Sequence, residues 1–250
     1  TLKACLKLWM GVSPTHSGVN SAGNGPAMRS ALIGVMADSD EHLYRLVATS
    51  TAVTHSDNRA EQGAAVIARL ARWVTQPIEQ RPALEQVVLD GVKDGQLRDN
   101  LEIAMRLGND SAGTKKFTSE LCLSKGVSGF VNHTVPAAVY CWLANRDSYR
   151  DAVEAAVCLG GDSDTVAAIT GAISGSELGP HAIPDEWLTG LREWPCSVAW
   201  MKGLSKQLDA YQEGLASDVP SFSIIVTLIR NLVFTLIVLG HGFRRLLPPY

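Results

Sequence analysis

The sequence predicts an all-α protein, and three observations support that prediction. Apolar residues recur at helical spacing along most of the 250-residue chain. No two neighbouring runs of alternating, β-branched residues are joined by a hairpin turn. Alanine and glycine are frequent on the predicted helices, and short side chains at helix contacts let the axes approach closely. We therefore expect a compact, multi-helix domain followed by an apolar C-terminal helix.

The helical segments follow one another from the start of the chain. Residues 1–11, TLKACLKLWMG, have the composition of a helix interior. The clearest period lies in residues 56–74, where Asp57 or Asn58 is placed to cap the helix. Its buried face comprises Ala60, Gly63, Ala64, Ile67, Leu70, Ala71 and Val74. The same period recurs in residues 84–92, 97–107, 135–144, 149–159, 165–174 and 198–211. The longest break, Gly108 to Thr134, is predicted to be an ordered functional loop.

Composition excludes several classes of protein. Apolar residues make up 46% of the chain and charged residues 19%, which is typical of a globular protein. The net charge of −3, with lysine and arginine spread singly, excludes general nucleic-acid binding. The five cysteines are widely spaced without a CxxC pair, so neither a disulfide framework nor a zinc site is predicted. No leader sequence opens the chain, and we expect a cytoplasmic protein.

The stretch CLGGDSDTVAAITGAISG, residues 158–175, places two carboxylates and a hydroxyl between segments that are otherwise suited to burial. Gly160 and Gly161 can form a positive-φ turn that ends one helix. Asp162 or Ser163 could then cap the next helix, with Asp164 in its first turn. Alternatively, the clustered oxygens are hard ligands of the kind that Mg²⁺ prefers. The residues alone leave the cap and the metal site as equal alternatives.

This stretch resembles the C-terminal signature of the ADP-ribosylglycohydrolase family, which includes the dinitrogenase-reductase-activating glycohydrolases. In that family the two aspartates and the threonine of the motif are ligands of a binuclear Mg²⁺ centre, sometimes occupied by Mn²⁺. The resemblance implies that Asp162, Asp164 and Thr165 are metal ligands and that Mg²⁺ is the cofactor, with Mn²⁺ as a substitute. It extends from about Leu2 to about Tyr211 and leaves the acceptor of the ADP-ribosyl group open.

A second motif, SAGNGPAMRSA at residues 21–31, is similar to the GNGxxMR segment of the same family. There a loop and a helix N-terminus hold the diphosphate of ADP-ribose. The resemblance implies a ligand-binding set of Ser21, Gly23, Asn24, Gly25, Met28 and Arg29. Glycines allow a backbone to approach phosphates, and Pro26 suits a first helical turn. Taken alone, the GNG sequence favours a plain turn over a phosphate-binding loop.

Two more segments resemble the family. TAVTHSDNRA, residues 51–60, matches a stretch that lines the ligand cleft, which makes His55 a candidate ligand contact. The alternative for His55 is a capping or surface role. KGVSGFVNHTVPAAVYCWL, residues 125–143, resembles the segment that contacts the adenosine or distal ribose, here through Gly129 and Phe130. The alternative for Phe130 is a place in the core.

The chain also departs from the family pattern. Family members begin with an acidic Gly-Asp-Ala stretch that carries a glutamate, followed by an Asp-Asp-Thr type motif, and neither occurs in these 250 residues. We therefore expect residues 1–215 to form an N-terminally incomplete ADP-ribosylglycohydrolase-like domain. Three interpretations follow: the sequence is part of a longer protein, the missing part is a separate chain, or the domain is a degenerate binder.

The resemblance implies a Mg²⁺-dependent hydrolase that cleaves an ADP-ribosyl glycosidic linkage in an ADP-ribosylated protein or a small ADP-ribosyl compound. Such cleavage passes through an oxocarbenium-like state, so the site must hold the ribose and activate water. Asp164 is the candidate that takes the proton from that water. The alternatives are a non-catalytic module that binds ADP-ribose, and a helical interaction protein without a small-molecule site.

Residues 216–250 form a separate tail in this interpretation. Its apolar run, residues 224–239, is interrupted by Arg230 and Asn231 and is slightly short of a membrane span. An arginine near the centre of a span costs about 2.5–3.5 kcal/mol. The sequence therefore favours a buried or partner-facing helix, with membrane association through residues 224–239 as the alternative. In that alternative Arg244 and Arg245 would lie at the cytoplasmic flank.

Overall fold

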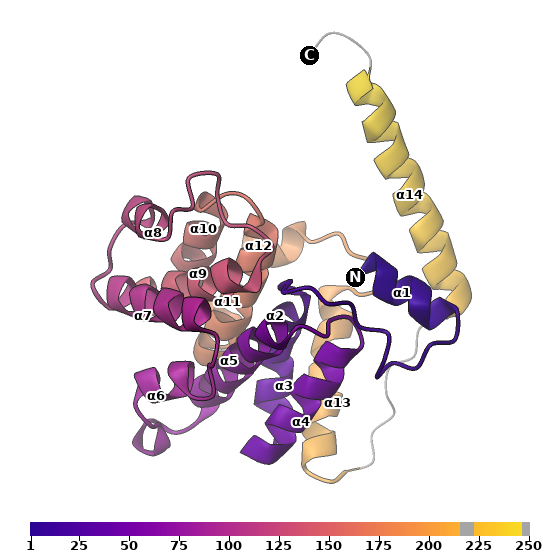
Figure 1. The fold of residues 1–250 in the computed structure, drawn as a ribbon. Helices are drawn as coiled ribbons and strands as arrows, with labels where there is room; N and C mark the ends of the chain where they lie inside the picture. Colours follow the sequence, from indigo (N-terminus) through magenta and orange to yellow (C-terminus); the bar gives the residue numbers. More distant parts are fainter. Residues whose placement is uncertain (216–222, 247–250) are drawn as a thin grey trace. The chain divides into compact units, whose positions relative to one another are not determined.

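The computed structural model describes residues 1–215 and 223–246, and these residues form helices and connecting segments without any strand (Figure 1). The α-helices are α1 (Leu2–Trp9), α2 (Gly25–Met28), α3 (Ser30–Met36), α4 (Asp40–Ala52), α5 (Asn58–Thr75), α6 (Leu84–Leu89), α7 (Gly95–Asn109), α8 (Thr114–Glu120), α9 (Val131–Ala144), α10 (Tyr149–Cys158), α11 (Ser163–Leu178), α12 (Asp185–Gly190), α13 (Val198–Gln212) and α14 (Ile224–Leu246). Two short 3₁₀ turns accompany them, η1 (Ile78–Gln80) and η2 (Pro180–Ala182). The prediction of an all-α fold with an apolar C-terminal helix is confirmed.

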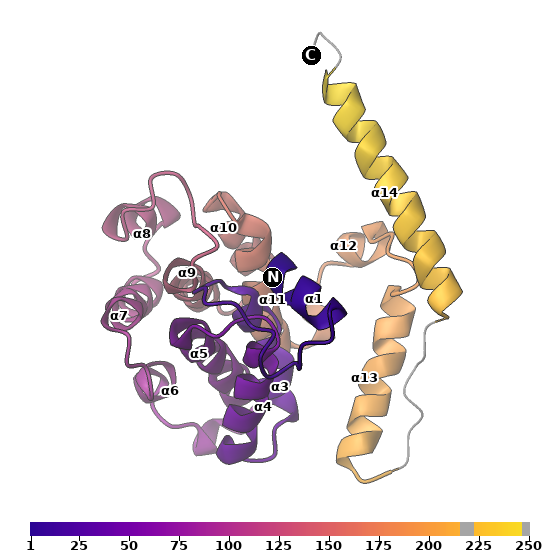
Figure 2. The ribbon, with the colours of Figure 1, turned by 45° about the vertical axis from the view of Figure 1, so that its right-hand side comes forward.

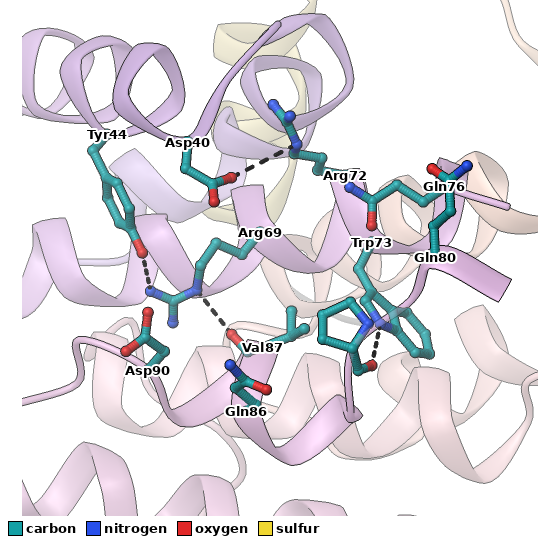
Figure 3. Close-up of a pocket in the computed structure, with 11 residues that line it drawn as sticks. Asp40, Tyr44, Arg69, Arg72, Trp73, Gln76, Gln80, Gln86, Val87 and Asp90 are labelled. Atoms are coloured by element: carbon teal, nitrogen blue, oxygen red, sulfur yellow. Dashed lines mark hydrogen bonds and ion pairs between the residues drawn. The ribbon is translucent and has the colours of Figure 1, made fainter. Parts of the chain in front are cut away.

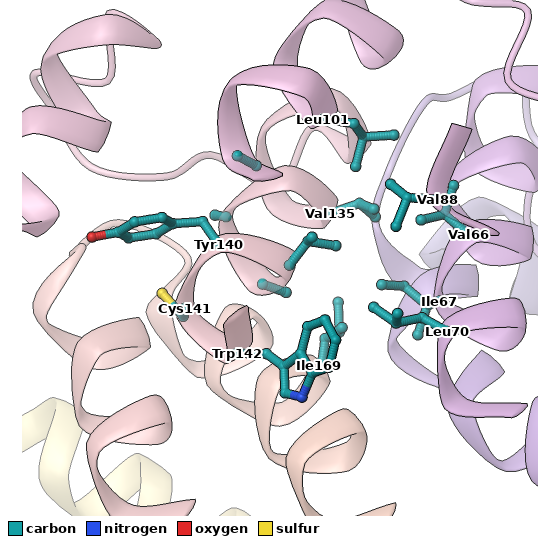
Figure 4. Packing of buried hydrophobic residues seen from close by; sticks show 14 of the residues in the cluster. Val66, Ile67, Leu70, Val88, Leu101, Val135, Tyr140, Cys141, Trp142 and Ile169 are labelled. Carbon is teal, nitrogen blue, oxygen red and sulfur yellow. The ribbon is translucent and has the colours of Figure 1, made fainter. Parts of the chain in front are cut away.

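The chain divides into two compact units, residues 1–183 and residues 184–250. In the first unit α5 is the central helix and contacts α2, α3, α4, α6, α9 and α11. Figure 4 shows side chains from several helices meeting in its core, among them Ile67 of α5, Leu101 of α7, Trp142 of α9 and Ile169 of α11. Helices α2, α5, α9 and α11, whose starts carry the predicted site residues, are therefore held by one core.

Small residues allow these helices to approach closely, as the composition predicted. A Cβ atom on Gly34 of α3 would lie 1.9 Å from the carbonyl oxygen of Ala68 in α5. A Cβ atom on Gly63 of α5 would lie 2.3 Å from a methyl group of Val131 in α9. Neither contact distance is possible for a real side chain, so glycine is required at both crossings.

The predicted loop from Gly108 to Thr134 contains a helix, so that prediction is wrong for its central part. Helix α8 forms there because Phe117 is fully buried and stacks on Tyr140 of α9, with ring centroids 4.2 Å apart. A single aromatic residue among polar neighbours gave no helical period to detect. The stretch between α8 and α9 remains irregular and carries Gly129 and Phe130.

The second unit contains α12, α13 and α14, of which α13 and α14 are its long helices (Figure 2). Ser197 caps α13 by accepting a hydrogen bond from the backbone N–H of Trp200. Within this unit Arg230 of α14 forms an ion pair with Glu193, at 2.7 Å. The division of the chain at residue 215 stays a prediction, and part of the predicted tail, residues 216–222 and 247–250, lies outside the described residues.

Candidate functional site

Four stretches of sequence that are far apart along the chain meet through isolated backbone pairings. Val19 pairs with His55, Gly23 with Phe130, and Val127 with Gly161. These pairings bring the GNG segment, the Thr-His segment, the loop before α9 and the GGDSDT segment together. Helices α2, α5, α9 and α11 all begin in these segments. The structure thus assembles the motifs that the sequence analysis identified separately.

Asp162 lies between two of these motifs. Its Oδ2 accepts a hydrogen bond of 2.5 Å from the side-chain amide of Asn24, and its Oδ1 accepts one of 3.0 Å from the hydroxyl of Thr165. Asp162 is the residue before α11, but its side chain makes no capping hydrogen bond. The capping interpretation is therefore wrong for Asp162, whose half-buried carboxylate joins two loops instead.

The turn that presents Asp162 is formed as predicted. Gly160 and Gly161 have φ values of 69° and 72°, which glycine adopts without strain. A Cβ atom on Gly161 would lie 2.1 Å from the carbonyl oxygen of Val127, so the two backbones touch. On the other side, a Cβ atom on Gly129 would lie 3.3 Å from Oδ2 of Asp162. Glycine at 129 and 161 thus leaves room for the carboxylate and its partners.

The three predicted metal ligands differ in exposure. Asp162 and Thr165 are half-buried, whereas Asp164 is exposed in the first turn of α11 and its Oδ1 accepts a hydrogen bond from the backbone N–H of Thr165. Two carboxylates and a hydroxyl are oxygen donors of the kind that Mg²⁺ takes together with several waters. The described residues contain no group of three or more His, Cys, Asp or Glu side chains arranged to hold a metal. The metal site therefore stays a prediction, with a donor set whose chemistry fits it.

The glycines of the GNG segment face a histidine. A Cβ atom on Gly23 would lie 2.8 Å from Nε2 of His55, and a Cβ atom on Gly25 would lie 3.1 Å from its Cε1. Asn24, between them, bonds through its backbone N–H to the carbonyl oxygen of Gly129 at 3.1 Å. Its side-chain amide also donates to Thr134 at 3.0 Å. The segment is thus wrapped around an imidazole, a reason for its glycines that the sequence alone did not show.

His55 is only 4% exposed, so neither a surface role nor a capping role applies; Asp57 caps α5 instead. The Nδ1 atom of His55 is 2.8 Å from the hydroxyl of Thr54. Burial lowers the pKa of His55 below its ordinary value, and the positive charge of Arg29 acts in the same direction while Asp57 opposes it. Burial thus favours the neutral imidazole over the protonated one.

His55 also lines a cavity of about 340 Å³ at the start of α5. The other lining residues are Thr15, His16, Gly18, Thr51, Ala52, Ser56, Asp57 and Glu61. The buried hydroxyl of Thr51 has no hydrogen-bond partner among the described residues. The carboxylates of Asp57 and Glu61 line the cavity together with the imidazole, so its walls disfavour an anion.

Arg29 does not point a free guanidinium at a ligand. Its nitrogens donate to the carbonyl oxygens of Gly25 and Ser50 and to the hydroxyls of Ser50 and Thr54, at 2.7–3.0 Å. Burial lowers the pKa of this guanidinium. Arg29 thus ties the GNG segment to the end of α4. Met28 is 50% exposed and Ser21 is also exposed, so both present surface to solvent.

Phe130 lies at the edge of the site and is half-buried, which is a different place from the core. The guanidinium of Arg59 is 5.5 Å from its ring centroid, and the ring of His133 meets it edge-on at 5.2 Å. Arg59 is itself held by Asp57, whose carboxylate accepts bonds of 3.0 and 2.7 Å from it. The sequence analysis did not identify Arg59, His133 and Thr134. Their contacts depend on the starts of α5 and α9 lying side by side, which no local pattern reports.

A second pocket, of about 290 Å³, contains none of the predicted site residues (Figure 3). Its two arginines bond to the chain: Arg69 donates to the carbonyl oxygen of Val87 at 2.8 Å, and Arg72 to that of Ala37 at 2.7 Å. Ala37 directly follows α3 and Val87 lies in the last turn of α6, where backbone carbonyls have no partner inside the helix. The arginines of this pocket thus stabilise the fold by donating hydrogen bonds to backbone carbonyl groups at the ends of helices.

Comparisons with known proteins agree with these motifs. A model of the ADP-ribosylglycohydrolase family matches residues 1–217. An uncharacterised protein of Archaeoglobus fulgidus is 32% identical over 193 residues, covering 76% of this chain and 60% of that protein. ADP-ribosylhydrolase ARH3 of Bos taurus is 29% identical over 200 residues, covering 68% of this chain and 54% of that protein.

A solved structure of an ADP-ribosylglycohydrolase-related protein complex has the same fold, with a TM-score of 0.60 and 24% identity. It covers 85% of this chain, which in turn covers 66% of that structure. The chain spans 60% of the length of the archaeal relative and 54% of that of the bovine relative. Over most of its length, however, it matches the family model, and it belongs to the ADP-ribosylglycohydrolase family.

Proposed function

We propose that this chain carries the ADP-ribose-binding half of a hydrolase that cleaves an ADP-ribosyl glycosidic linkage. The observation that carries the proposal is the position of Asp162, whose carboxylate is held by Asn24 of one family motif and Thr165 of the other. The substrate is an ADP-ribosylated protein or a small ADP-ribosyl compound. The similarity to the bovine relative, which is named an ADP-ribosylhydrolase, supports this class of reaction.

The starts of the helices favour an anionic ligand. Unpaired backbone N–H groups and the helix dipole make a helix N-terminus attractive to phosphate. The first turns of α5, α9 and α11 adjoin the same cluster, and α2 begins within it. The diphosphate of ADP-ribose would lie against the GNG segment, with Gly129 and Phe130 beside the adenosine or the distal ribose. The cavity beside His55 would accept an uncharged part of the same ligand.

The donor set of Asp162, Asp164 and Thr165 supports binding of Mg²⁺, or Mn²⁺ in its place, as part of a binuclear centre. When bound, the ion supplies positive charge that orients the ribose hydroxyls and polarises water. Asn24 holds the carboxylate of Asp162 in one orientation by donating to its Oδ2. The exposed carboxylate of Asp164 is free to accept the proton of the attacking water. All five cysteines are unpaired, which supports a location in the cytoplasm.

Calorimetric titration of ADP-ribose into the chain tests the proposal, with and without Mg²⁺, in the wild type and in Asp162→Ala/Asp164→Ala. We expect Mg²⁺ to strengthen binding in the wild type and to have no effect in the variant. A control variant, Asp99→Ala/Asp110→Ala, removes two exposed aspartates in and just after α7 and should behave as the wild type. Equal binding without Mg²⁺ would favour a non-catalytic binding module. No binding by the folded chain would refute the proposal.

A further inference from the structure

Helix α14 presents a continuous apolar stripe to solvent. Along its 23 residues, large apolar side chains recur every three or four positions, which places them on one face. They are Ile225, Leu228, Leu232, Leu236, Leu239 and Phe243, each between 49% and 68% exposed. The stripe runs nearly the whole length of the helix, and such a surface in contact with water marks an interaction site.

The side of α14 opposite the stripe is mixed. Its polar residues are Thr227, Arg230, Asn231, Thr235, His241 and Arg245, and Phe234 and Val238 lie among them, 55% and 51% exposed. Arg230 identifies the face that adjoins the rest of the second unit, because its guanidinium bonds to Glu193 at 2.7 and 3.1 Å. The same guanidinium lies 5.3 Å from the ring centroid of Phe234. The polar residues of α14 are therefore confined to this mixed side, where Arg230 is already paired within the unit.

The charged residues of α14 are all basic. Residues 223–250 contain three arginines and a histidine but no aspartate or glutamate, although the whole chain has a net charge of −3. Arg244 and Arg245 stand together at the C-terminal end of the helix. A helix with a wide apolar face, basic residues and no acidic ones is typical of segments that lie in the surface of an anionic bilayer.

We propose that α14 lies along the surface of a membrane containing anionic lipids, with its apolar stripe among the acyl chains and Arg244 and Arg245 among the headgroups. The helix is long and apolar enough to span a bilayer. A span would, however, carry Arg230 and its partner Glu193 away from water, which membranes strongly disfavour. A surface orientation keeps that ion pair in water and still buries the stripe. This inference is independent of the proposed hydrolase activity.

Sedimentation of the whole chain with vesicles tests this orientation. Vesicles of phosphatidylcholine alone are compared with vesicles that also contain phosphatidylserine. We expect binding to the second kind, weakened by salt. Leu232→Gln/Leu236→Gln, which interrupts the stripe with neutral polar groups, should lower binding at least tenfold. The control variant Thr227→Gln/Thr235→Gln places the same side chain at two positions of α14 that are already polar and should bind as the wild type.

Charge is tested separately with Arg244→Ala/Arg245→Ala. Because each basic residue near an anionic surface contributes about fivefold to partitioning, binding to phosphatidylserine vesicles should fall roughly 20-fold. The substituted side chains of the stripe are exposed, so thermal unfolding of the variants should match the wild type, which shows that lost binding is not lost folding.

Four results would overturn the proposal. Binding that survives Leu232→Gln/Leu236→Gln, or no binding to either kind of vesicle, would show that the stripe does not enter a membrane. Bound protein that resists extraction with alkaline carbonate would indicate a spanning helix instead. A wild-type dimer in ultracentrifugation that dissociates in Leu232→Gln/Leu236→Gln and ignores vesicles would identify the stripe as a protein interface.

Discussion

The side-chain amide of Asn24 donates a hydrogen bond of 2.5 Å to the carboxylate of Asp162, which is 138 positions further along the chain. The same amide nitrogen lies 3.0 Å from the hydroxyl of Thr134 at the start of α9. One asparagine therefore connects the starts of α2, α9 and α11. The hydroxyl of Thr165 holds the other oxygen of this half-buried carboxylate, so the two donors fix its orientation together.

Substitution of Asn24 should loosen the site. In Asn24→Ala the carboxylate of Asp162 and the hydroxyl of Thr134 each lose a donor, and an unsatisfied, partly buried polar group costs about 1–3 kcal/mol. We expect the free energy of unfolding, measured by urea denaturation, to fall by that amount. Asn58→Ala, at an exposed position in the first turn of α5, is the control and should stay within about 0.5 kcal/mol of the wild type. Equal stability of the two variants would mean that the bond contributes nothing.

The close contact between Gly23 and His55 predicts that the effects of substituting these two residues on the free energy of unfolding are strongly coupled. The imidazole of His55 is buried, and its Nδ1 is 2.8 Å from the hydroxyl of Thr54, so the ring has little room to move away from a methyl group at Gly23. Gly23→Ala should lower the free energy of unfolding by about 1–3 kcal/mol, as overpacking does elsewhere.

A double-mutant cycle checks that cause. In a His55→Ala background, which removes the imidazole, Gly23→Ala should cost less than about 0.5 kcal/mol. Gly95→Ala is the matched control, because a Cβ atom at this position would have no other atom within 4 Å and the helix start gains from the substitution. If Gly23→Ala costs the same in both backgrounds, the imidazole is not what requires the glycine.

The sequence predicts features that depend on a local pattern, and it does not predict those that depend on contacts between distant residues. Helices with a long apolar period, such as α5 and α9, could be predicted because the period itself reports the buried face. Helix α8 could not, since its burial depends on the single residue Phe117 meeting Tyr140 from another helix. For the site, the motifs identified the segments that meet. The partners of each side chain, such as Asn24 for Asp162 and His55 for Gly23, depend on tertiary contacts that no local pattern contains.

A cluster of charged and aromatic side chains at the ends of α5, α9 and α11 should be a main determinant of stability. Glu177 accepts bonds of 2.8 and 2.5 Å from Arg146 and one of 2.8 Å from the indole of Trp142. The guanidinium of Arg146 lies 5.1 and 5.2 Å from the rings of Trp73 and Trp142. Removal of the carboxylate would leave Arg146, which is 34% exposed, and Arg81, which is 16% exposed and 3.6 Å from Glu177, without their counter-charge.

We therefore expect Glu177→Ala to lower the free energy of unfolding by roughly 2–4 kcal/mol. Glu154→Ala, which removes an exposed glutamate paired with Arg150 in the same helix, is the comparison and should change little. Thermal unfolding of both variants measures the difference. A small effect of Glu177→Ala would show that solvent screens this cluster as it screens the surface pair.

The buried imidazole of His55 makes the stability of the fold depend on pH. Burial lowers the pKa of His55, and that of His133, below the ordinary value of 6.5. Below about pH 6.5 the unfolded chain takes up protons that the folded chain refuses. The unfolded state is then favoured, so the free energy of unfolding should fall as the pH is lowered from 7.5 to 5. His55→Gln cannot titrate and should show a shallower fall, whereas His181→Gln, at an exposed turn, should follow the wild type. Urea denaturation at several pH values compares these slopes, and parallel slopes for wild type and His55→Gln would rule out His55 as the source.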